Sequence, residues 1–349
     1  MSELPEGVLF CMGNPLLDIS AEVDKSFLER FGLKANDAIL AEEKHVPMYR
    51  ELQGKTDVDY VAGGATQNTC RVFQWVVRQR DRCVYMGCIG KDEFGNILAE
   101  KAREAGVNVR YQINETTPTG TCAVLLTDGG THRSLCANLA AANCFTLDHL
   151  LKEDNLKLME NAQYYYISGF FLTVSVDSML HVGKHATAKG KPFCMNLSAP
   201  FLCGVFSTQM MSVMPYVDIL FGNESEAAEL AKAQGWPSDC TKEIAKRAEK
   251  LPKESGSRLV VFTQGCDPVI VIQNGAVTEY PVERIPKEDI IDTNGAGDSF
   301  VGGFLAGYVQ VQKTIAECVA LGVKCASMMI RQSGCSLPDR KSYENALGF

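Results

Sequence analysis

Hydrophobic and polar residues alternate in blocks through the second half of the chain. Four hydrophobic runs show little internal alternation, at residues 164–167, 192–196, 217–221 and 259–263. Such runs are typical of parallel strands that are covered on both faces of a sheet. Amphipathic segments of helical length occur at residues 174–189, 207–214, 225–234 and 242–251. The pattern predicts an α/β fold, with a large, mainly parallel sheet, helices on both faces and right-handed crossovers. A hairpin signal at 269–282, around Asn274-Gly275, predicts an antiparallel edge.

The first half of the chain predicts shorter elements. Residues 8–12 and 36–40 are strand-like, and residues 25–31 are helix-like. Residues 118–126 and 132–135 flank a polar, glycine-containing turn, which predicts a second hairpin. Composition reveals no linker, internal repeat or low-complexity tract.

Residues 290–304 pass from a hydrophobic start through a tight turn into a helical pattern. The hydrophobic stripe of the predicted helix consists of Phe300, Val301, Phe304, Leu305 and Tyr308. Glycines at 302, 303 and 307 would each cost an exposed helix about 1 kcal/mol. We therefore expect this helix to pack closely against another part of the chain.

The turn before that helix has the character of an anion-binding site. Gly295, Ala296 and Gly297 let backbone N–H groups converge at the positive end of the helix dipole. Asp298 places a carboxylate in the first helical turn, where it would repel a bound phosphate. A general base that takes a proton from an attacking hydroxyl needs this position. Alternatively, Asp298 only satisfies the helix dipole.

Three other polar clusters follow predicted strands. Asp18 is either a turn residue or a carboxylate that accepts hydrogen bonds from a sugar diol. Gly63-Gly64, followed by Asn68, is either an ordinary turn before a helix or a close approach of a ligand to the backbone. Asn223 and Glu226 have the spacing of a helix capping box. Ligands of open α/β sheets bind beyond the carboxyl ends of strands, so one shared cleft is expected.

Bulk properties narrow the classes of function. The net charge of −8 over 349 residues argues against a nucleic-acid-binding face. The acidic N-terminus does not resemble a signal or transit peptide, and no hydrophobic stretch is long enough to span a bilayer. The fourteen cysteines contain no Cys-x-x-Cys pair, which predicts reduced, mostly buried thiols in a cytoplasmic protein. His181 and His185 have metal-ligand spacing, but a solvated helix face explains them better.

The motif at 292–298, Asp-x-x-Gly-Ala-Gly-Asp, resembles the C-terminal signature of the ribokinase-like family of sugar and nucleoside kinases. The segments 63–68 and 87–95 are similar to the N-terminal hallmarks of that family. The resemblance covers essentially the whole chain. It is strongest to members that phosphorylate adenosine, through residues 13–20, 169–175, 196–201 and 215–224.

The resemblance implies a role for each matching residue. The residues implied for adenosine are Asn14, Asp18, Leu40, Gly63, Gly64, Ala65, Asn68, Cys122, Leu135, Ala137, Leu139, Phe170 and Asn294. Those implied for ATP are Asn196, Asn223, Glu226, Thr263, Gln264, Gly265 and Asn294. Those implied for catalysis are Asp298 as base, Gly295, Ala296 and Gly297 as anion hole, and Arg133 at the transferring phosphoryl group.

The family further implies a small α/β lid domain made from residues 16–62 and 116–142. The remainder, residues 1–15, 63–115 and 143–349, would form the large domain. Mg²⁺ would be held near Glu226, through water, and a monovalent cation is compatible with the family. We expect a monomer in the cytoplasm, with a nuclear pool compatible, that binds neither nucleic acid nor membrane.

Two alternatives remain at the level of the sequence. The chain could be a related kinase for another nucleoside or a free sugar, although an apolar lid and Phe170 favour a nucleobase. It could also be a nucleoside-binding protein without activity, although such a protein would not need Asp298. Ala38 and Ala65 stand where family members often carry Gln and Ser. Because alanine has no polar side chain, the selectivity for the nucleobase is less well determined by the resemblance than the type of reaction.

Overall fold

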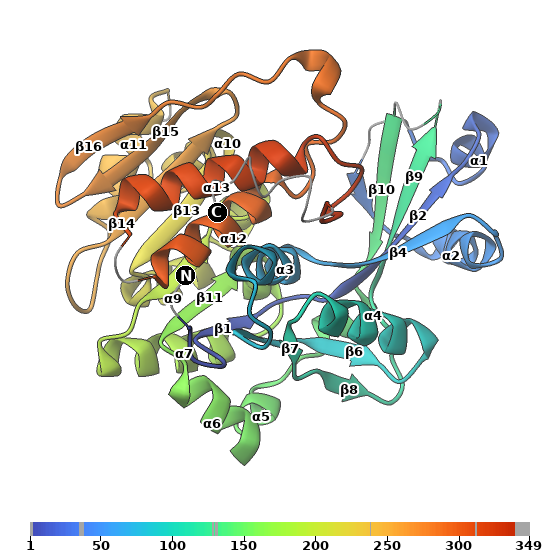
Figure 1. Cartoon of the computed structure of the whole chain (residues 1–349), viewed down its shortest axis with the longest axis horizontal. Coiled ribbons are helices and arrows are strands. Elements are labelled where there is room, and N and C mark those ends of the chain that lie inside the picture. The colour runs from blue at the N-terminus through green and yellow to red at the C-terminus, as the bar shows by residue number, and fades with distance from the viewer. Residues whose placement is uncertain are drawn as a thin grey trace.

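The computed structural model describes residues 3–34, 38–127, 129, 132–237, 239–310 and 313–338, and only the backbone of residues 38, 132 and 133. Its centre is a nine-stranded sheet (Figure 1). In spatial order the strands are β16 (Ala276–Tyr280), β15 (Asp267–Gln273), β14 (Leu259–Gln264), β13 (Ile219–Asn223), β12 (Phe193–Asn196), β11 (Tyr164–Ser168), β1 (Leu9–Met12), β5 (Cys83–Met86) and β7 (Asn108–Val109). The strands from β14 to β7 are parallel, and β15 and β16 are antiparallel to their neighbours.

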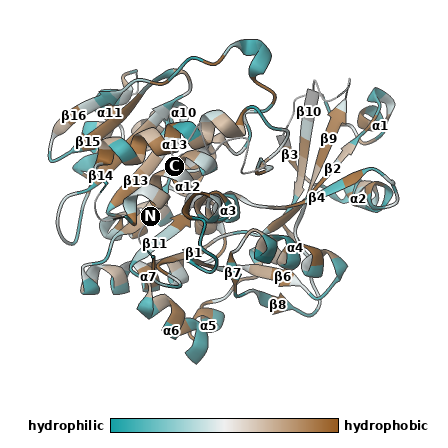
Figure 2. Ribbon diagram, viewed as in Figure 1, coloured by the Kyte–Doolittle hydropathy of each residue, from teal (hydrophilic) through white to brown (hydrophobic). Residues whose placement is uncertain are grey.

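Two hydrophobic cores lie on the two faces of this sheet, because alternate residues of β1 enter different cores. The helices of the first core that lie against the large sheet include α3 (Ala65–Val77), α4 (Glu93–Glu104), α12 (Ala296–Tyr308) and α13 (Ile315–Met329). Those of the second are α5 (Leu147–Leu150), α6 (Glu153–Asn161), α7 (Val176–Lys189), α8 (Pro200–Val205), α9 (Ser207–Val213), α10 (Glu224–Ala233) and α11 (Thr241–Glu249). Figure 2 shows hydrophobic residues concentrated in the strands and in α12.

The glycines of α12 allow the close packing that the sequence predicts. A Cβ at Gly302 would lie 2.8 Å from the carbonyl oxygen of Thr69 in α3, and one at Gly303 would lie 2.7 Å from Cys325 in α13. Since these distances are shorter than any real contact, only glycine lets the three helices approach this far. The beginning of α3 and the beginning of α12 are thereby fixed relative to each other.

A second, five-stranded sheet projects to one side of the large sheet, at the right in Figure 1. Its strands, in spatial order, are β3 (Ala38–Leu40), β10 (His132–Asn138), β9 (Thr121–Thr127), β2 (Leu16–Glu22) and β4 (Val58–Gly63). The helices α1 (Lys25–Arg30) and α2 (Val46–Gln53) accompany this small sheet. All five strands come from residues within 16–63 and 121–138, which matches the segments expected for a lid. The division into two domains stays a prediction.

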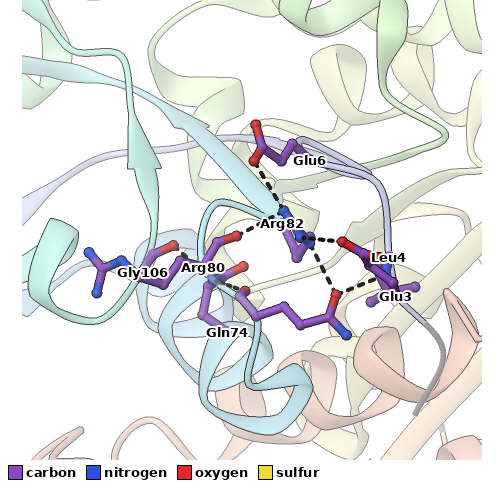
Figure 3. Close-up of polar contacts among 8 residues, drawn as sticks. Glu3, Leu4, Glu6, Gln74, Arg80, Arg82 and Gly106 are labelled. Carbon is purple, nitrogen blue, oxygen red and sulfur yellow. Dashed lines mark hydrogen bonds and ion pairs between the residues drawn. The ribbon is translucent and has the colours of Figure 1, made fainter.

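The N-terminal segment is tied to the turn after α3 by polar contacts (Figure 3). The backbone N–H of Leu4 donates to the Gln79 side chain at 2.8 Å, and Arg82 forms an ion pair with Glu6 at 3.6 Å. Gln74 of α3 donates to the carbonyl oxygen of Gly106 at 2.7 Å. A further short sheet pairs β6 (Cys88–Gly90) with β8 (Gln112–Asn114). Within the described residues no helix combines the length and hydrophobicity needed to cross a membrane.

The predicted parallel strands, both hairpins and the intervening helices are confirmed, with ends shifted by a few residues. The sequence analysis did not foresee α2, α5, α6, α8 or α13. The helix α13 was missed although its buried residues Cys318, Val319, Leu321, Cys325, Met328 and Met329 lie at helical spacing along one face. The cysteines are free, and most are buried, as expected.

Candidate active site

Asp298 lies where α12 begins and meets α3. The Asn68 side-chain amide donates to the Asp298 carboxylate over 3.0 Å, and the Thr69 hydroxyl donates to the Asp298 backbone oxygen over 3.2 Å. Burial raises the pKa of Asp298 to about 7. The nearby Asp18 carboxylate adds to this rise, whereas the hydrogen bond from Asn68 opposes it. A carboxyl group with this pKa can accept a proton near neutral pH.

The residues Gly295, Ala296 and Gly297, predicted as an anion hole and called the anion-hole turn below, precede Asp298 directly. Gly295 has a φ of 74°, a left-handed conformation that favours glycine, and it caps α12. Nothing lies within 4 Å of a Cβ built on Gly297, so a ligand can approach its backbone. Asp292 fixes the turn, since its carboxylate accepts from the Asn294 backbone N–H at 2.9 Å and from that of Gly334 at 3.1 Å. The first turn of α12 is therefore held open toward a cleft.

Two glycines bring the small sheet against the beginning of α3. A Cβ at Gly63 would lie 2.4 Å from a carboxylate oxygen of Asp18. At Gly64, with a φ of +95°, a Cβ would lie 2.1 Å from the Asn14 carbonyl oxygen. Asn14 and Asn68 are both 8% exposed, and the side-chain oxygen of each is buried without a hydrogen-bond partner among the described residues. Two unpaired acceptors beside Asp18 suit a ligand that carries several hydroxyl groups.

A row of residues crosses the small sheet from Asp18. Its β-sheet register aligns Leu40 with Ala137, Ala137 with Cys122, and Cys122 with Asp18. Residues aligned in this way share one face of a sheet. Leu40 is 64% exposed, which is unusual for a leucine on a packed sheet. Leu135 lies two positions before Ala137 in β10, on the same face. The sheet therefore presents an apolar surface next to the carboxylate.

The ring of Phe170 has a neighbour that the sequence analysis did not assign to the site. Phe170 lies in the 3-10 helix Gly169–Thr173, and its ring centroid is 6.3 Å from that of Phe201. Phe201 opens α8 and is 50% exposed. Its position directly after Pro200, beyond the carboxyl end of β12, was the available signal. Asn196 holds this turn, because its side-chain oxygen accepts from the Gly169 N–H at 3.2 Å.

The predicted capping box at the beginning of α10 is confirmed. The Glu226 carboxylate accepts from the Asn223 backbone N–H at 3.0 Å and from its side-chain amide at 2.9 Å. Glu226 is 7% exposed, and burial raises its pKa to about 7, with Asp298 contributing to the rise. Asn223 is aligned with Thr263 at the carboxyl ends of β13 and β14. A second carboxyl group with a pKa near neutrality therefore lies close enough to Asp298 to interact with it electrostatically.

A cavity of about 270 Å³ adjoins the anion-hole turn on the side of β14. Its lining includes Thr263, Gly265, Ala296 and Gly297, all of which were predicted for the site, and the hydrophobic residues Val269, Val282, Ile285, Ile290 and Phe300. A largely apolar cavity with a few backbone groups is a common form of nucleobase or cofactor pocket. Gln264 does not line it, because its side chain donates to the Pro268 carbonyl oxygen at 2.7 Å.

The structure thus brings Asn14, Asp18, Gly63, Gly64, Asn68 and Asp298 together at one point. The structure groups these residues, but the role predicted for each site residue stays a prediction. The side chains of Arg133 and Ala38 lie outside the described part of the chain. The Asn294 side chain is engaged within the turn itself, donating to Asp292 at 2.7 Å.

A family model described as "pfkB family carbohydrate kinase" matches residues 25–341. The chain belongs to the pfkB family. The expected ribokinase-like fold and the resemblance to sugar and nucleoside kinases are therefore confirmed.

Curated relatives of this pfkB-family chain carry the name adenosine kinase. Adenosine kinase 2 of Arabidopsis thaliana is 49% identical over 340 residues, which cover 97% of this chain and 98% of that relative. The adenosine kinase of Dictyostelium discoideum is 45% identical over 333 residues, covering 95% and 96%. Sequence similarity thus extends over the whole chain, as the motifs predicted.

Solved structures of adenosine kinases are also similar to this chain over nearly its full length. The adenosine kinase of Anopheles gambiae, in complex with P1,P4-di(adenosine-5) tetraphosphate, is 49% identical with a TM-score of 0.86, covering 96% of this chain and 100% of that one. The Schistosoma mansoni enzyme in complex with adenosine, in an occluded loop conformation, is 36% identical with a TM-score of 0.88, covering 98% and 100%.

Proposed function

We propose that this chain is an ATP-dependent nucleoside kinase that transfers the γ-phosphate of ATP to the 5′-hydroxyl of adenosine, giving AMP and ADP. The observation that carries the proposal is the contact of Asn68 with Asp298 at the anion-hole turn. In this position Asp298, whose pKa is about 7, lies between two proposed binding regions. One is the apolar face of the small sheet with the oxygens of Asn14, Asp18 and Asn68. The other is the apolar cavity beside β14. Curated relatives named adenosine kinase, at 45–49% identity over nearly the full chain, support the substrate.

The ribose would bind where the small sheet meets α3. Asp18 would accept hydrogen bonds from the vicinal hydroxyls, and the buried oxygens of Asn14 and Asn68 would gain the donors they lack. Gly63 and Gly64 leave room for this approach. These contacts orient the 5′-hydroxyl toward Asp298, and holding two reactants in this way supplies much of the rate of phosphoryl transfer.

The adenine would lie between the apolar row of the small sheet and the pair Phe170–Phe201. An aromatic face suits a nucleobase better than a free sugar, which favours a nucleoside over the sugar alternative. The exposed Leu40 would be covered when base and sheet come together. We therefore propose that the small sheet acts as a lid, formed within residues 16–62 and 116–142, that closes over adenosine and excludes water.

The ATP would occupy the cavity on the other side of the turn, with its base against the hydrophobic lining. The Anopheles gambiae structure contains a ligand that joins two adenosines through four phosphates. Such a ligand contains the two adenosine units of an adenosine–ATP pair and one phosphate more than ATP, which is compatible with two pockets separated by the anion-hole turn. The backbone N–H groups of Gly295, Ala296 and Gly297 would stabilise the charge on the phosphoryl oxygens, with Arg133 of the lid hairpin assisting.

Asp298 would take the proton from the 5′-hydroxyl as the oxygen attacks the γ-phosphorus. Its pKa of about 7 makes this proton transfer effective near neutral pH. The hydrogen bond from Asn68 holds the carboxylate in position, and that from Thr69 holds its backbone. A protein that only binds nucleosides would gain nothing from a buried, destabilising carboxyl group at this point.

Mg²⁺ fits the chemistry of the Asn223–Glu226 pair. Glu226 is a buried carboxyl group, and burial raises its pKa to about 7, so a nearby cation would stabilise its ionised form. Both of its oxygens already accept hydrogen bonds from Asn223, so it would hold the ion through water. When bound, Mg²⁺ neutralises charge on the phosphate oxygens. We further propose a cytoplasmic monomer that binds neither nucleic acid nor membrane, supported by its acidic charge and its free, mostly buried thiols.

The test is a coupled assay of ADP release with ATP and Mg²⁺ across adenosine, inosine, guanosine, cytidine, ribose and fructose. We expect a strong preference for adenosine. Preference for another acceptor would keep the mechanism and overturn the proposed base pocket. Binding of adenosine without turnover would instead identify a non-catalytic nucleoside-binding protein.

A further inference from the structure

Three cysteines from separate segments meet beneath the active site. Cys11 belongs to β1, Cys83 to the adjacent strand β5, and Cys70 to α3, which covers them. Their sulfur atoms all lie within 4.8 Å of one another, and those of Cys11 and Cys83 are 3.8 Å apart. In the described ranges, no other three cysteine, histidine or acidic side chains offer ligand atoms in such a group. The proposed kinase reaction makes no use of this cluster.

The cluster is fully enclosed. All three cysteines are 0% exposed, and they belong to the core between α3 and the large sheet. The Tyr85 hydroxyl, aligned with Cys11 on the neighbouring strand, is also 0% exposed and has no hydrogen-bond partner among the described residues. The three sulfur atoms thus lie in an apolar enclosure away from water. Three buried thiolates are therefore too costly unless a ligand removes their charge.

The need to cancel the charge of three thiolates narrows the choice of thiophilic ion. Soft thiolate ligands suit Cu(I), Zn²⁺ and related metals. A complex of three thiolates has a net charge of −2 with Cu(I) and −1 with Zn²⁺. Structural Zn²⁺ sites also have a fourth protein ligand, which this cluster lacks among the described residues. A trivalent ion gives a neutral complex with three thiolates, which an apolar core accommodates at the lowest cost. Trivalent arsenic forms such three-coordinate complexes.

We propose that Cys11, Cys70 and Cys83 form a binding site for trivalent arsenic, supplied as arsenous acid. Three As–S bonds form and three As–O bonds break. The three thiol protons leave with the three hydroxide groups as water, so no charge is buried and nothing is oxidised or reduced.

The enclosure decides how the site fills. Because the three sulfur atoms have no contact with solvent, arsenous acid reaches them when the strands and α3 separate. The protein should therefore take up arsenic readily when it refolds in the presence of arsenite. Once the core has closed, release should be slow, since the arsenic is as inaccessible as the sulfur atoms.

The test is refolding of the reduced, full-length chain with excess sodium arsenite, followed by gel filtration. We expect one arsenic per chain by native mass spectrometry, with the mass increased by one arsenic less three hydrogens. X-ray absorption at the arsenic edge should show three sulfur neighbours and no oxygen. Retention of no arsenic, or an arsenic bound to fewer than three sulfurs, would overturn the proposal.

Variants locate the site. C70A and C83A should lose the retained arsenic, whereas C194A, which removes another fully buried cysteine of the large sheet outside the cluster, should keep it. If all three variants retained the same amount of arsenic, the arsenic would be bound elsewhere and the proposal would be wrong. If an alanine variant fails to refold, the sulfur count from the unmodified chain still decides the outcome.

Discussion

Asn68 donates a hydrogen bond to the carboxylate of Asp298 over 3.0 Å, across 230 positions of the chain. The contact joins the beginnings of α3 and α12, whose backbones approach closely at Gly302. Asn68 keeps its side-chain oxygen unpaired in the same place. The Asn68 side chain can therefore orient the Asp298 carboxylate through its nitrogen and bind the sugar through its oxygen.

Replacing Asp298 with Asn should lower kcat by roughly 10²–10⁴-fold, because it removes the general base and leaves the shape of the site intact. Adenosine affinity, measured by calorimetry without ATP, should stay within a fewfold of the parent. A D298N enzyme with near-parental turnover would exclude the base role. Loss of adenosine binding would mean that the residue acts on the substrate ground state.

The same substitution should stabilise the protein in a pH-dependent way. The pKa of Asp298 is raised from 3.8 to about 7, so folding takes up a proton between these values and stability falls as pH rises through this range. D298N removes this cost. We expect its free energy of unfolding to exceed the parent's by roughly 1–3 kcal/mol above pH 7, after allowance for partial solvent contact, and to match it below about pH 4.

Urea unfolding at pH 4, 6 and 8 measures this difference. D239N, at an exposed aspartate, is the matched control and should change stability equally little at every pH. A D298N advantage that grew as pH fell would contradict the direction of the shift.

Gly63→Ala should weaken adenosine binding by about 1–3 kcal/mol through displacement of Asp18 and the loss of its hydrogen bonds. The added Cβ would lie 2.4 Å from the Asp18 carboxylate, so the side chain must move. The measurement is KM for adenosine against KM for ATP, and only the former should rise. Gly54→Ala is the control, because the nearest atom to its Cβ is 3.5 Å away. An unchanged KM for adenosine in G63A would remove Asp18 from the sugar site.

The parallel strands β11, β12, β13 and β14 and the helices α7, α9, α10 and α11 were predictable, because continuous hydrophobic runs and helical periodicity are local features of the sequence. The capping box of Asn223 and Glu226 was predictable for the same reason, since its partners are three residues apart. The raised pKa of Asp298 was not, because it depends on burial and on Asp18, which lies 280 positions away in the chain. Phe201 was missed as a site residue because its exposure becomes visible only once β12 and α8 are placed.

Removing either aromatic ring of the proposed base pocket should weaken nucleoside binding by about 1–3 kcal/mol, in the range of base–aromatic stacking. F170A and F201A should therefore raise KM for adenosine more than they change kcat. V205A, at a residue 76% exposed on the same helix as Phe201, should behave like the parent. If F201A affected only the KM for ATP, Phe201 would belong to the other pocket.

Glu226→Gln should raise the Mg²⁺ concentration needed for half-maximal activity by roughly 10–100-fold, the usual effect of losing an outer-sphere carboxylate. The carboxylate carries the charge that attracts the ion, and Gln keeps the size of the side chain while removing that charge. Gln also presents an N–H₂ group to one of the two Asn223 donors, so the beginning of α10 should loosen slightly.

S225A separates the loss of charge from the loosening of the helix cap, because Ser225 contacts the Asn223 side chain at 2.8 Å but carries no charge. A titration with Mg²⁺ at fixed ATP should shift for E226Q and stay in place for S225A. Identical titrations for E226Q and the parent would leave Glu226 with the capping role alone.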